Sequence, residues 1–194
     1  MTLPLFPLST VLFPGCQLDL QIFEARYLDM LSRCLRQDSE FGVVCIIEGA
    51  EVGQAARRFA DVGCAASIRD WQQRPNGLLG IRVEGTRRFR VLSSQVQRDQ
   101  STLADVEWLD EPPERPLLAG HADLAALLEA LAEHPLVAAL GMGGVAEGQQ
   151  ALANQLGYLL PFTEEAKLEL LAIGDPPQRL ERIQQLLEQL QGED

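Results

Sequence analysis

The sequence has 194 residues and a formal net charge of −12, with 46% hydrophobic and 23% charged residues. These proportions are typical of a globular protein and exclude a disordered chain or a fibrous repeat. A chain of this length buries about 70% of its unfolded surface without needing a metal or a disulfide. No segment is apolar over the roughly 18–20 residues that a membrane span requires, and the start lacks a basic leader. We therefore expect a cytoplasmic protein.

The negative charge is concentrated in the second part of the chain. Up to Pro112 there are 15 acidic and 12 basic residues, whereas from Pro113 onward there are 13 acidic and only 4 basic ones. Proteins that bind nucleic acid gain most of their affinity from clustered Lys and Arg, and anionic lipid attracts the same residues. The charge therefore argues against both nucleic acid and membrane as partners.

The first 110 residues are rich in short β-like runs, several of which alternate apolar and polar residues with a period of two. These runs cover residues 17–23, 41–47, 62–72, 78–83, 87–97 and 103–109. The segment Arg74-Pro-Asn-Gly77 predicts the turn of a hairpin, because Pro fixes φ and Asn-Gly tolerates positive φ.

One helix is expected to interrupt these strands, from about residue 24 to residue 36. Asp29 and Arg33 form an i,i+4 pair on its polar side. Its apolar stripe consists of Tyr27, Leu28, Leu31, Cys34 and Leu35.

A proline-rich segment at residues 110–116 is the best candidate for a domain boundary, since three prolines in this stretch stop both strand and helix. We expect a β-rich domain over residues 1–112 and a helical domain over residues 113–194. Two leucine stripes support the helical assignment. They are Leu124, Leu127, Leu128 and Leu131 in one helix, and Leu152, Leu156, Leu159 and Leu160 in another.

Two helix starts can be predicted in the second part. Thr163 is placed to cap a helix that carries Glu164 and Glu165 in its first turn. Asp175-Pro-Pro-Gln178 supplies a capping side chain and a proline at the first helical position. The last helix has a heptad of apolar residues, which we interpret as packing within the helical part because the repeat is too short for a coiled coil. The heptad residues are Leu180, Ile183, Leu187 and Leu190.

The residues needed for common catalytic and metal sites are missing from the sequence. The four cysteines form no Cys-x-x-Cys pair, and the two histidines, His121 and His134, have no metal-pair spacing. Cys34 and Cys45 are expected to be buried thiols. No Gly-x-Ser-x-Gly elbow is present, and Lys167, the sole lysine, lies in neither a phosphate loop nor an apolar setting. We expect no cofactor, no metal and no catalytic residue.

Long motifs in the first part of the chain resemble the N-terminal, substrate-binding domain of Lon proteases. The opening carries Leu3-Pro-Leu-Phe-Pro-Leu8, then Val11-Leu-Phe-Pro-Gly15 and then Leu18-x-Leu-x-Ile-Phe-Glu-x-Arg-Tyr27. Further matches are Phe41-Gly-Val-Val44, Val83-Glu-Gly-x-x-Arg-Phe-Arg90 and, in the helical part, Leu159-Leu-Pro161. The resemblance spans nearly the whole chain.

The resemblance implies an α+β fold: a PUA-like, twisted β pseudo-barrel with one helix, followed by a C-terminal helical bundle. Full Lon enzymes continue into an ATPase module and a Ser-Lys protease module, and neither is present here. The resemblance therefore implies a free-standing, non-enzymatic module that binds polypeptide, most plausibly unfolded or exposed apolar segments.

Such a module needs a hydrophobic groove or a free strand edge, which we expect at the barrel rim or at its cleft with the helical part. The candidate binding residues are Phe13, Trp71 and Arg74, together with Arg26, for which a structural salt bridge is the stronger interpretation. The first alternative function is an adaptor that docks one folded protein through its acidic helices. RNA binding through Arg82, Arg87, Arg88 and Arg90 is a weaker alternative, and independent proteolysis would have to rely on Lys167.

Overall fold

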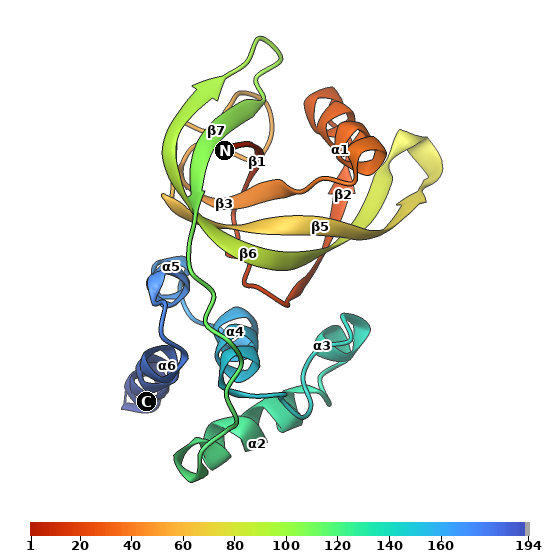
Figure 1. The fold of residues 1–194 in the computed structure, drawn as a ribbon. Coiled ribbons are helices and arrows are strands. Elements are labelled where there is room, and N and C mark those ends of the chain that lie inside the picture. The colour runs from red at the N-terminus through yellow and green to blue at the C-terminus, as the bar shows by residue number, and fades with distance from the viewer. Residues whose placement is uncertain (193–194) are drawn as a thin grey trace. The chain divides into compact units, whose positions relative to one another are not determined.

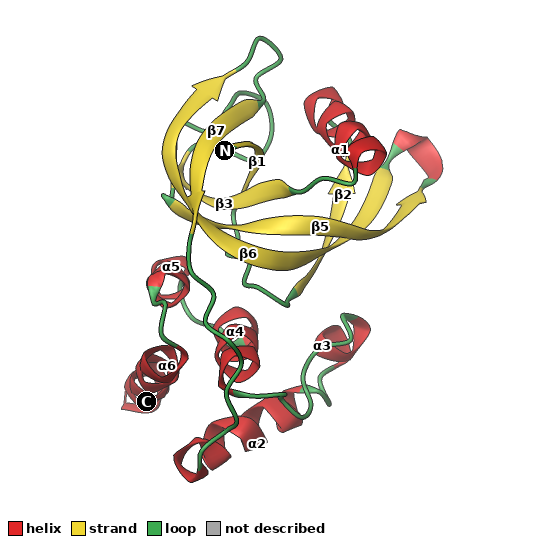
Figure 2. Ribbon diagram, in the orientation of Figure 1, coloured by secondary structure: helices red, strands yellow, loops and turns green. Residues whose placement is uncertain are grey.

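The computed structural model describes residues 1–192, and the chain divides into two compact units, Met1–Leu109 and Asp110–Asp194. The first unit contains seven strands and one α-helix, and the second is helical (Figures 1 and 2). The expected α+β class, with a twisted sheet followed by helices, is confirmed.

The strands of the first unit close on themselves. They are β1 (Thr2–Leu8), β2 (Gln17–Ile22), β3 (Phe41–Glu48), β4 (Arg58–Phe59), β5 (Val62–Gln73), β6 (Leu79–Val96) and β7 (Thr102–Trp108). The sheet order runs β1-β7-β6-β5-β3-β4, and a parallel pairing between β1 and β3 closes β1, β7, β6, β5 and β3 into a ring, with β4 paired to β3 outside it. The first half of β6 also pairs with β2, and its last half pairs with β7.

The predicted hairpin between β5 and β6 is confirmed. A short 3-10 turn, Pro75–Gly77, connects these strands, and both Asn76 (φ 73°) and Gly77 (φ 75°) have left-handed backbones. The paired strands form an arm that extends beyond the ring in Figure 1.

Three segments of the sheet differ from the sequence prediction. The two-residue strand β4 was not among the predicted strands, and neither was β1, which contains Pro4 and Pro7. The third is β6, which runs unbroken through Gly85 where two runs were expected. A Cβ at Gly85 would lie 2.2 Å from the carbonyl oxygen of Phe13, so this glycine serves a close backbone approach and does not end the strand.

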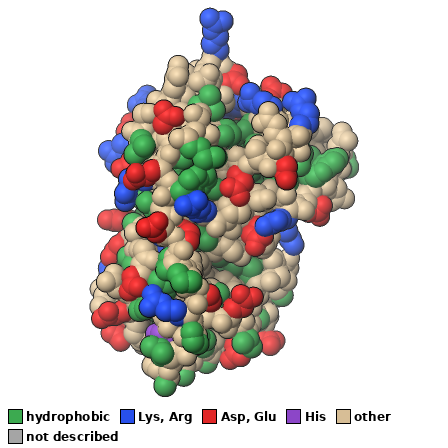
Figure 3. All heavy atoms as spheres, in the orientation of Figure 1, with side chains coloured by type: hydrophobic (Ala, Val, Ile, Leu, Met, Phe, Trp, Pro, Cys, Tyr) green, Lys and Arg blue, Asp and Glu red, His purple; other side chains and the backbone are tan. Residues whose placement is uncertain are grey.

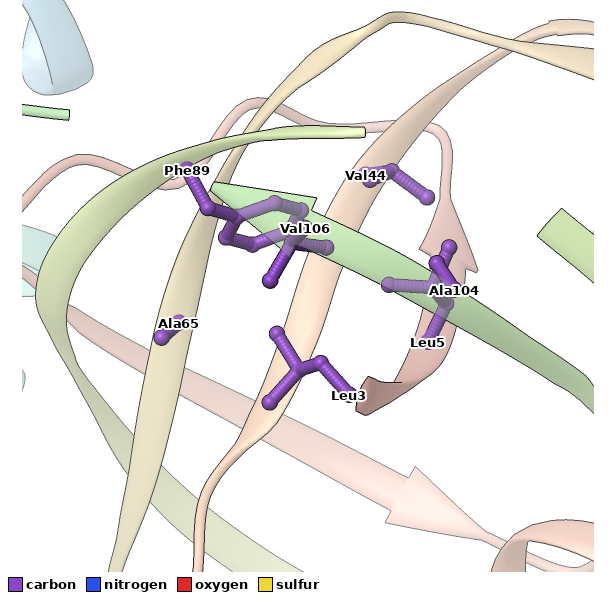
Figure 4. Packing of buried hydrophobic residues seen from close by; sticks show 7 residues of the cluster. All are labelled: Leu3, Leu5, Val44, Ala65, Phe89, Ala104 and Val106. Carbon is purple, nitrogen blue, oxygen red and sulfur yellow. The ribbon is translucent and has the colours of Figure 1, made fainter. Parts of the chain in front are cut away.

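The core inside the ring is built around Phe89. Its buried neighbours in this cluster are Leu3, Leu5, Val44, Ala65, Ala104 and Val106 (Figure 4). A Cβ at either Gly42 or Gly63 would lie 2.7 Å from the ring carbon Cζ of Phe89, so these glycines make room for the ring. Trp108 packs against it edge-on, with ring centroids 6.3 Å apart.

Helix α1 (Ala25–Gln37) packs on this unit through the stacked rings of Tyr27 and Phe6, whose centroids are 4.1 Å apart. Its buried face confirms Tyr27, Leu31 and Cys34 from the predicted stripe. Leu35 is instead 40% exposed, and Met30 is buried in addition to the stripe.

The second unit contains five helices among its described residues. They are α2 (Ala122–Leu131), α3 (Pro135–Ala139), α4 (Gln149–Leu159), α5 (Glu164–Ala172) and α6 (Pro176–Gly192). Their core includes Leu124, Leu128, Leu152, Leu156, Leu170, Leu180 and Ile183. The expected heptad packing of α6 is wrong at Leu190, which is 43% exposed, while Leu186 is buried. A straight helix with 3.6 residues per turn drifts away from a strict seven-residue repeat, which explains the shift.

Both predicted helix starts are present. The hydroxyl of Thr163 accepts a hydrogen bond from the amide of Ala166 at 3.1 Å, and Pro176 is the first residue of α6. Replacing Thr163 with alanine should lower the free energy of unfolding by about 1 kcal/mol, because one amide of the first turn loses its acceptor. Urea denaturation measures this loss. Thr163→Ser keeps the hydroxyl and should keep most of the stability, so equal losses in the two variants would contradict the capping role.

Candidate functional site

Two of the four sequence-predicted binding residues, all of which belong to the first unit, have buried side chains. The side chain of Phe13 is fully buried, so a ligand cannot contact it in this conformation. Arg26 is only 5% exposed. Phe13 lies in the loop that follows β1, and Arg26 lies at the start of α1. Both residues are part of the packed structure there, and neither lines a groove described below.

Arg26 joins three separate segments of the first unit. Its guanidinium donates to the carbonyl of Gln100 at 2.8 Å and to the carbonyl of Glu51 at 3.4 Å. Its Nε lies 3.3 Å from the carboxylate of Glu24, and the guanidinium carbon lies 4.6 Å from the ring centroid of Tyr27. These contacts support the structural interpretation of Arg26, because they hold two loops against the first turn of α1.

Trp71 and Arg74 are the two predicted residues that the fold brings together. Both line a groove of about 410 Å³ on the arm, which we call the arm groove. Trp71 lies opposite the buried Ile81 in the β5–β6 ladder and is 56% exposed. An exposed tryptophan beside a groove offers a large apolar contact area to a ligand.

Charges of both signs border the arm groove. Arg82 holds Asp19 through two hydrogen bonds, of 2.8 and 2.9 Å, across the β2–β6 pair. The hydrogen bond from Arg82 lowers the pKa of the Asp19 carboxyl, and the nearby charge of Arg74 acts in the same direction. Arg74 itself lies over Gly80, since a Cβ there would be 2.9 Å from its Nε. The groove combines an exposed aromatic ring with paired charges.

A larger groove, of about 820 Å³, lies in the wall of the ring, and sequence reasoning did not identify it. We call it the wall groove. It is bordered by residues 1–4 at the start of β1, by the C-terminal half of α1, by the connection 38–40 and by Ser67, Ile68 and Arg69 of β5. Leu35, the α1 residue that is unexpectedly exposed, is one of its lining residues.

The wall groove exists because β3 begins only at Phe41, whereas the strands on both sides of it continue past this point. The first residue of β3, Phe41, pairs with Ala66 of β5, and Gly42 pairs with Leu5 of β1. β5 continues beyond Ala66 to Gln73, paired with β6 on one side only. The sequence indicated that β5 would extend past β3, because the predicted strand at residues 62–72 is longer than the predicted strand at residues 41–47.

The chemistry of the wall groove suits binding. Arg33 and Arg69 face it together with Asp38 and Glu40, so neither sign dominates. Cys34 also lines the groove, and burial raises the pKa of its thiol, which keeps the sulfur protonated and unreactive at neutral pH.

The cysteines are buried in the fold, and the two histidines form hydrogen bonds with nearby backbone amides. All four cysteines are buried thiols, as expected for Cys34 and Cys45. His121 accepts a hydrogen bond from the amide of Leu118, and His134 accepts one from the amide of Leu136, both at 3.2 Å. Over residues 1–192, no group of three or more His, Cys, Asp or Glu side chains is arranged to hold a metal ion. The same residues include no helix with the length and apolarity to cross a bilayer.

Comparison with known proteins identifies the family. Residues 2–189 match the model of the ATP-dependent protease La (LON) substrate-binding domain. The structure is similar to the Lon N-terminal domain protein from Xanthomonas campestris, with 35% identity over 97% of this chain and 98% of that chain and a TM-score of 0.77. It also shares its fold with the N-terminal domain of the Mycobacterium avium complex Lon protease, at 17% identity, 94% and 96% coverage and a TM-score of 0.66. The chain belongs to the Lon substrate-binding domain family.

Proposed function

We propose that this protein binds segments of other polypeptides in the cytoplasm, preferring segments that are unfolded or that expose apolar side chains, and that it does so without catalysis. One observation carries the proposal. The chain belongs to a substrate-binding domain family, and it has an open groove that is bordered by an unpaired strand edge. Extended segments bind such edges through backbone hydrogen bonds, and neighbouring apolar surface adds affinity.

The arm groove supplies the apolar contact in this proposal. Trp71 is the large exposed aromatic residue at this groove, and Arg74 beside it can hold a carboxylate or a backbone carbonyl of the bound segment. Aromatic and arginine side chains are the residue types that most often dominate the binding energy of protein interfaces.

Replacing Trp71 with alanine should weaken binding of an unfolded model polypeptide about 5- to 30-fold, the loss expected for an aromatic anchor. A reduced, carboxymethylated protein with a fluorescent label is a suitable probe, titrated to concentrations on the order of tens of micromolar. Leu136→Ala is the matched control, because Leu136 is 72% exposed in the second unit and lines neither groove. Absence of binding by the wild-type protein, with no effect of Trp71→Ala, would contradict the proposal.

A second candidate function is docking of one folded partner through the acidic second unit. The four basic residues of this unit all make internal contacts: Arg115 with Asp175, Lys167 with the carbonyl of Tyr158, Arg179 with Asn154, and Arg182 with Glu169. The acidic excess therefore favours a basic partner. Affinity capture from the native cytosol separates the two functions, since one stoichiometric folded protein favours docking and a heterogeneous set of proteins favours segment binding.

The structure gives little support to RNA binding. Arg82 is paired with Asp19, Arg90 with Glu107, and Arg88 is only 2% exposed. Figure 3 shows basic side chains scattered among acidic ones on the face in view. RNA-binding grooves instead gather unpaired basic residues with stacking aromatic residues.

A further inference from the structure

We propose that the wall groove binds an extended polypeptide segment as an added β-strand on the free edge of β5. This inference rests on the proposed function and specifies how the segment is held. Its occupant is a short, extended stretch of another polypeptide whose backbone amides and carbonyls are available for hydrogen bonding.

The edge of β5 that faces β3 is unpaired beyond Ala66. β5 pairs with β3 only over Cys64, Ala65 and Ala66, whereas its pairing with β6 continues to Gln73. In an antiparallel strand, alternate residues direct their N–H and C=O groups toward opposite neighbours. Among residues 1–192, no backbone hydrogen bond is made to the β3-side edge of Ser67, Ile68 or Arg69. Unpaired strand edges of this kind are templates for another chain.

The space beside this edge has the width of one strand. Where β3 is present, it lies between β1 and β5, paired to both through Gly42. Before Phe41 the chain leaves this line, because Asp38 has a left-handed backbone (φ 49°) and the amide of Ser39 bonds to the carbonyl of Cys34 at the end of α1. Strands lie about 4.8 Å apart, so two strands that flank an unfilled position are about 10 Å apart. One strand fits into that width. A helix does not fit, because a helix with its side chains is about 10–12 Å in diameter.

The side chains around the groove combine an apolar contact with balanced charges. Leu35 gives an apolar contact at the rim, and the charges of Arg33 and Arg69 are offset by those of Asp38 and Glu40. A balanced charge selects no particular sign, so backbone pairing and apolar side chains decide what binds. The register shift between Ile68 and Asp70 marks a β-bulge at Arg69, which ends the regular edge. The added strand is therefore short, about three to four residues at the contact.

The experiment uses a labelled nonapeptide in which valine and serine alternate, together with two N-methylated versions of it. One version is methylated on odd positions and the other on even positions. N-methylation removes the donors on one edge of an extended peptide while keeping its side chains. We expect at least one of the two versions to bind about tenfold more weakly than the unmodified peptide, since two lost backbone hydrogen bonds account for that factor.

Two further measurements locate the site on this protein. Leu35→Arg should abolish peptide binding, whereas Leu136→Arg, the control at an exposed leucine of the second unit, should leave it unchanged. Circular dichroism verifies that both variants are folded. Hydrogen exchange should show new protection of amides within residues 67–69 when the peptide is bound.

The inference is overturned if the unmodified peptide does not bind, if both methylated versions bind as tightly as the unmodified one, or if Leu35→Arg binds normally. If the unfolded model protein still binds and responds to Trp71→Ala in those cases, the proposed function stands and only strand addition is wrong. If the unfolded protein also fails to bind, both are wrong.

Discussion

Replacing Arg179 with alanine is expected to lower the free energy of unfolding by about 3–4 kcal/mol, because several buried acceptors lose a charged donor. Arg179 is 2% exposed in α6 and donates to the carbonyl of Leu170 at 2.8 Å. It also donates to the carbonyl of Ile173 and to the amide oxygen of Asn154. One side chain thus satisfies acceptors at the end of α5, just beyond it and on α4, and fixes these helices against α6.

A neighbouring arginine provides the matched control for this prediction. Arg182 lies on the same helix, but its ion pair with Glu169 is partly exposed to solvent, so Arg182→Ala should cost no more than about 1 kcal/mol. Urea denaturation followed by far-ultraviolet circular dichroism compares the two variants. If Arg179→Ala proves as stable as Arg182→Ala, Arg179 does not hold the helices together.

Replacing Phe89 with alanine is expected to cost about 3–5 kcal/mol, the usual penalty for a large aromatic residue removed from a core. The aromatic ring of Phe89 is fully buried, and Gly42 and Gly63 leave room for it because they have no Cβ atoms. The surrounding strands therefore cannot collapse into the cavity without backbone movement. Trp108, which meets the ring edge-on, should become more accessible to fluorescence quenchers.

The control for the Phe89 prediction lies on the same strand. Leu92 is 61% exposed in β6, so Leu92→Ala should change the free energy of unfolding by less than about 0.5 kcal/mol. Thermal or urea denaturation of both variants measures the difference. Similar stability of the two variants would show that the ring interior is not organised around Phe89.

The sequence predicted the elements whose signals are local. The alternating runs identified most strands, and Thr163 and Pro176 marked helix starts through chemistry confined to one turn. Strand β1 was missed because its two prolines disfavour a strand locally, while its pairing to β3 and β7 joins residues far apart in the sequence. Strand β6 was predicted as two runs because the close approach of Phe13 to Gly85, which this glycine allows, is a tertiary contact.

The candidate site could be predicted only in part. Asn-Gly turn chemistry located the hairpin, and this placed Trp71 and Arg74 on one exposed arm. Phe13 was expected on a loop, and it is buried where Gly15 and Cys16 of that loop form backbone hydrogen bonds with Gly85 of β6. The wall groove depends on the register that leaves β5 longer than β3, and a register is set by pairing across the sheet and not by either strand alone.

The partners of the two buried arginines could not be predicted. The sequence favoured a structural salt bridge for Arg26 and gave no assignment for Arg179, although arginine is almost never fully buried without partners. Their partners are mainly backbone carbonyls of other segments, namely those of Gln100, Leu170 and Ile173. Carbonyl acceptors are present at every residue, so no pattern of residue types could identify them.

The central claim is that this chain holds polypeptide segments that lack stable structure. The most direct measurement is isothermal titration of the protein with one model protein in two forms, native and permanently unfolded. The account predicts saturable binding of the unfolded form, with an affinity on the order of tens of micromolar or tighter, and no binding of the native form. Equal binding of both forms, or binding of neither, would contradict it.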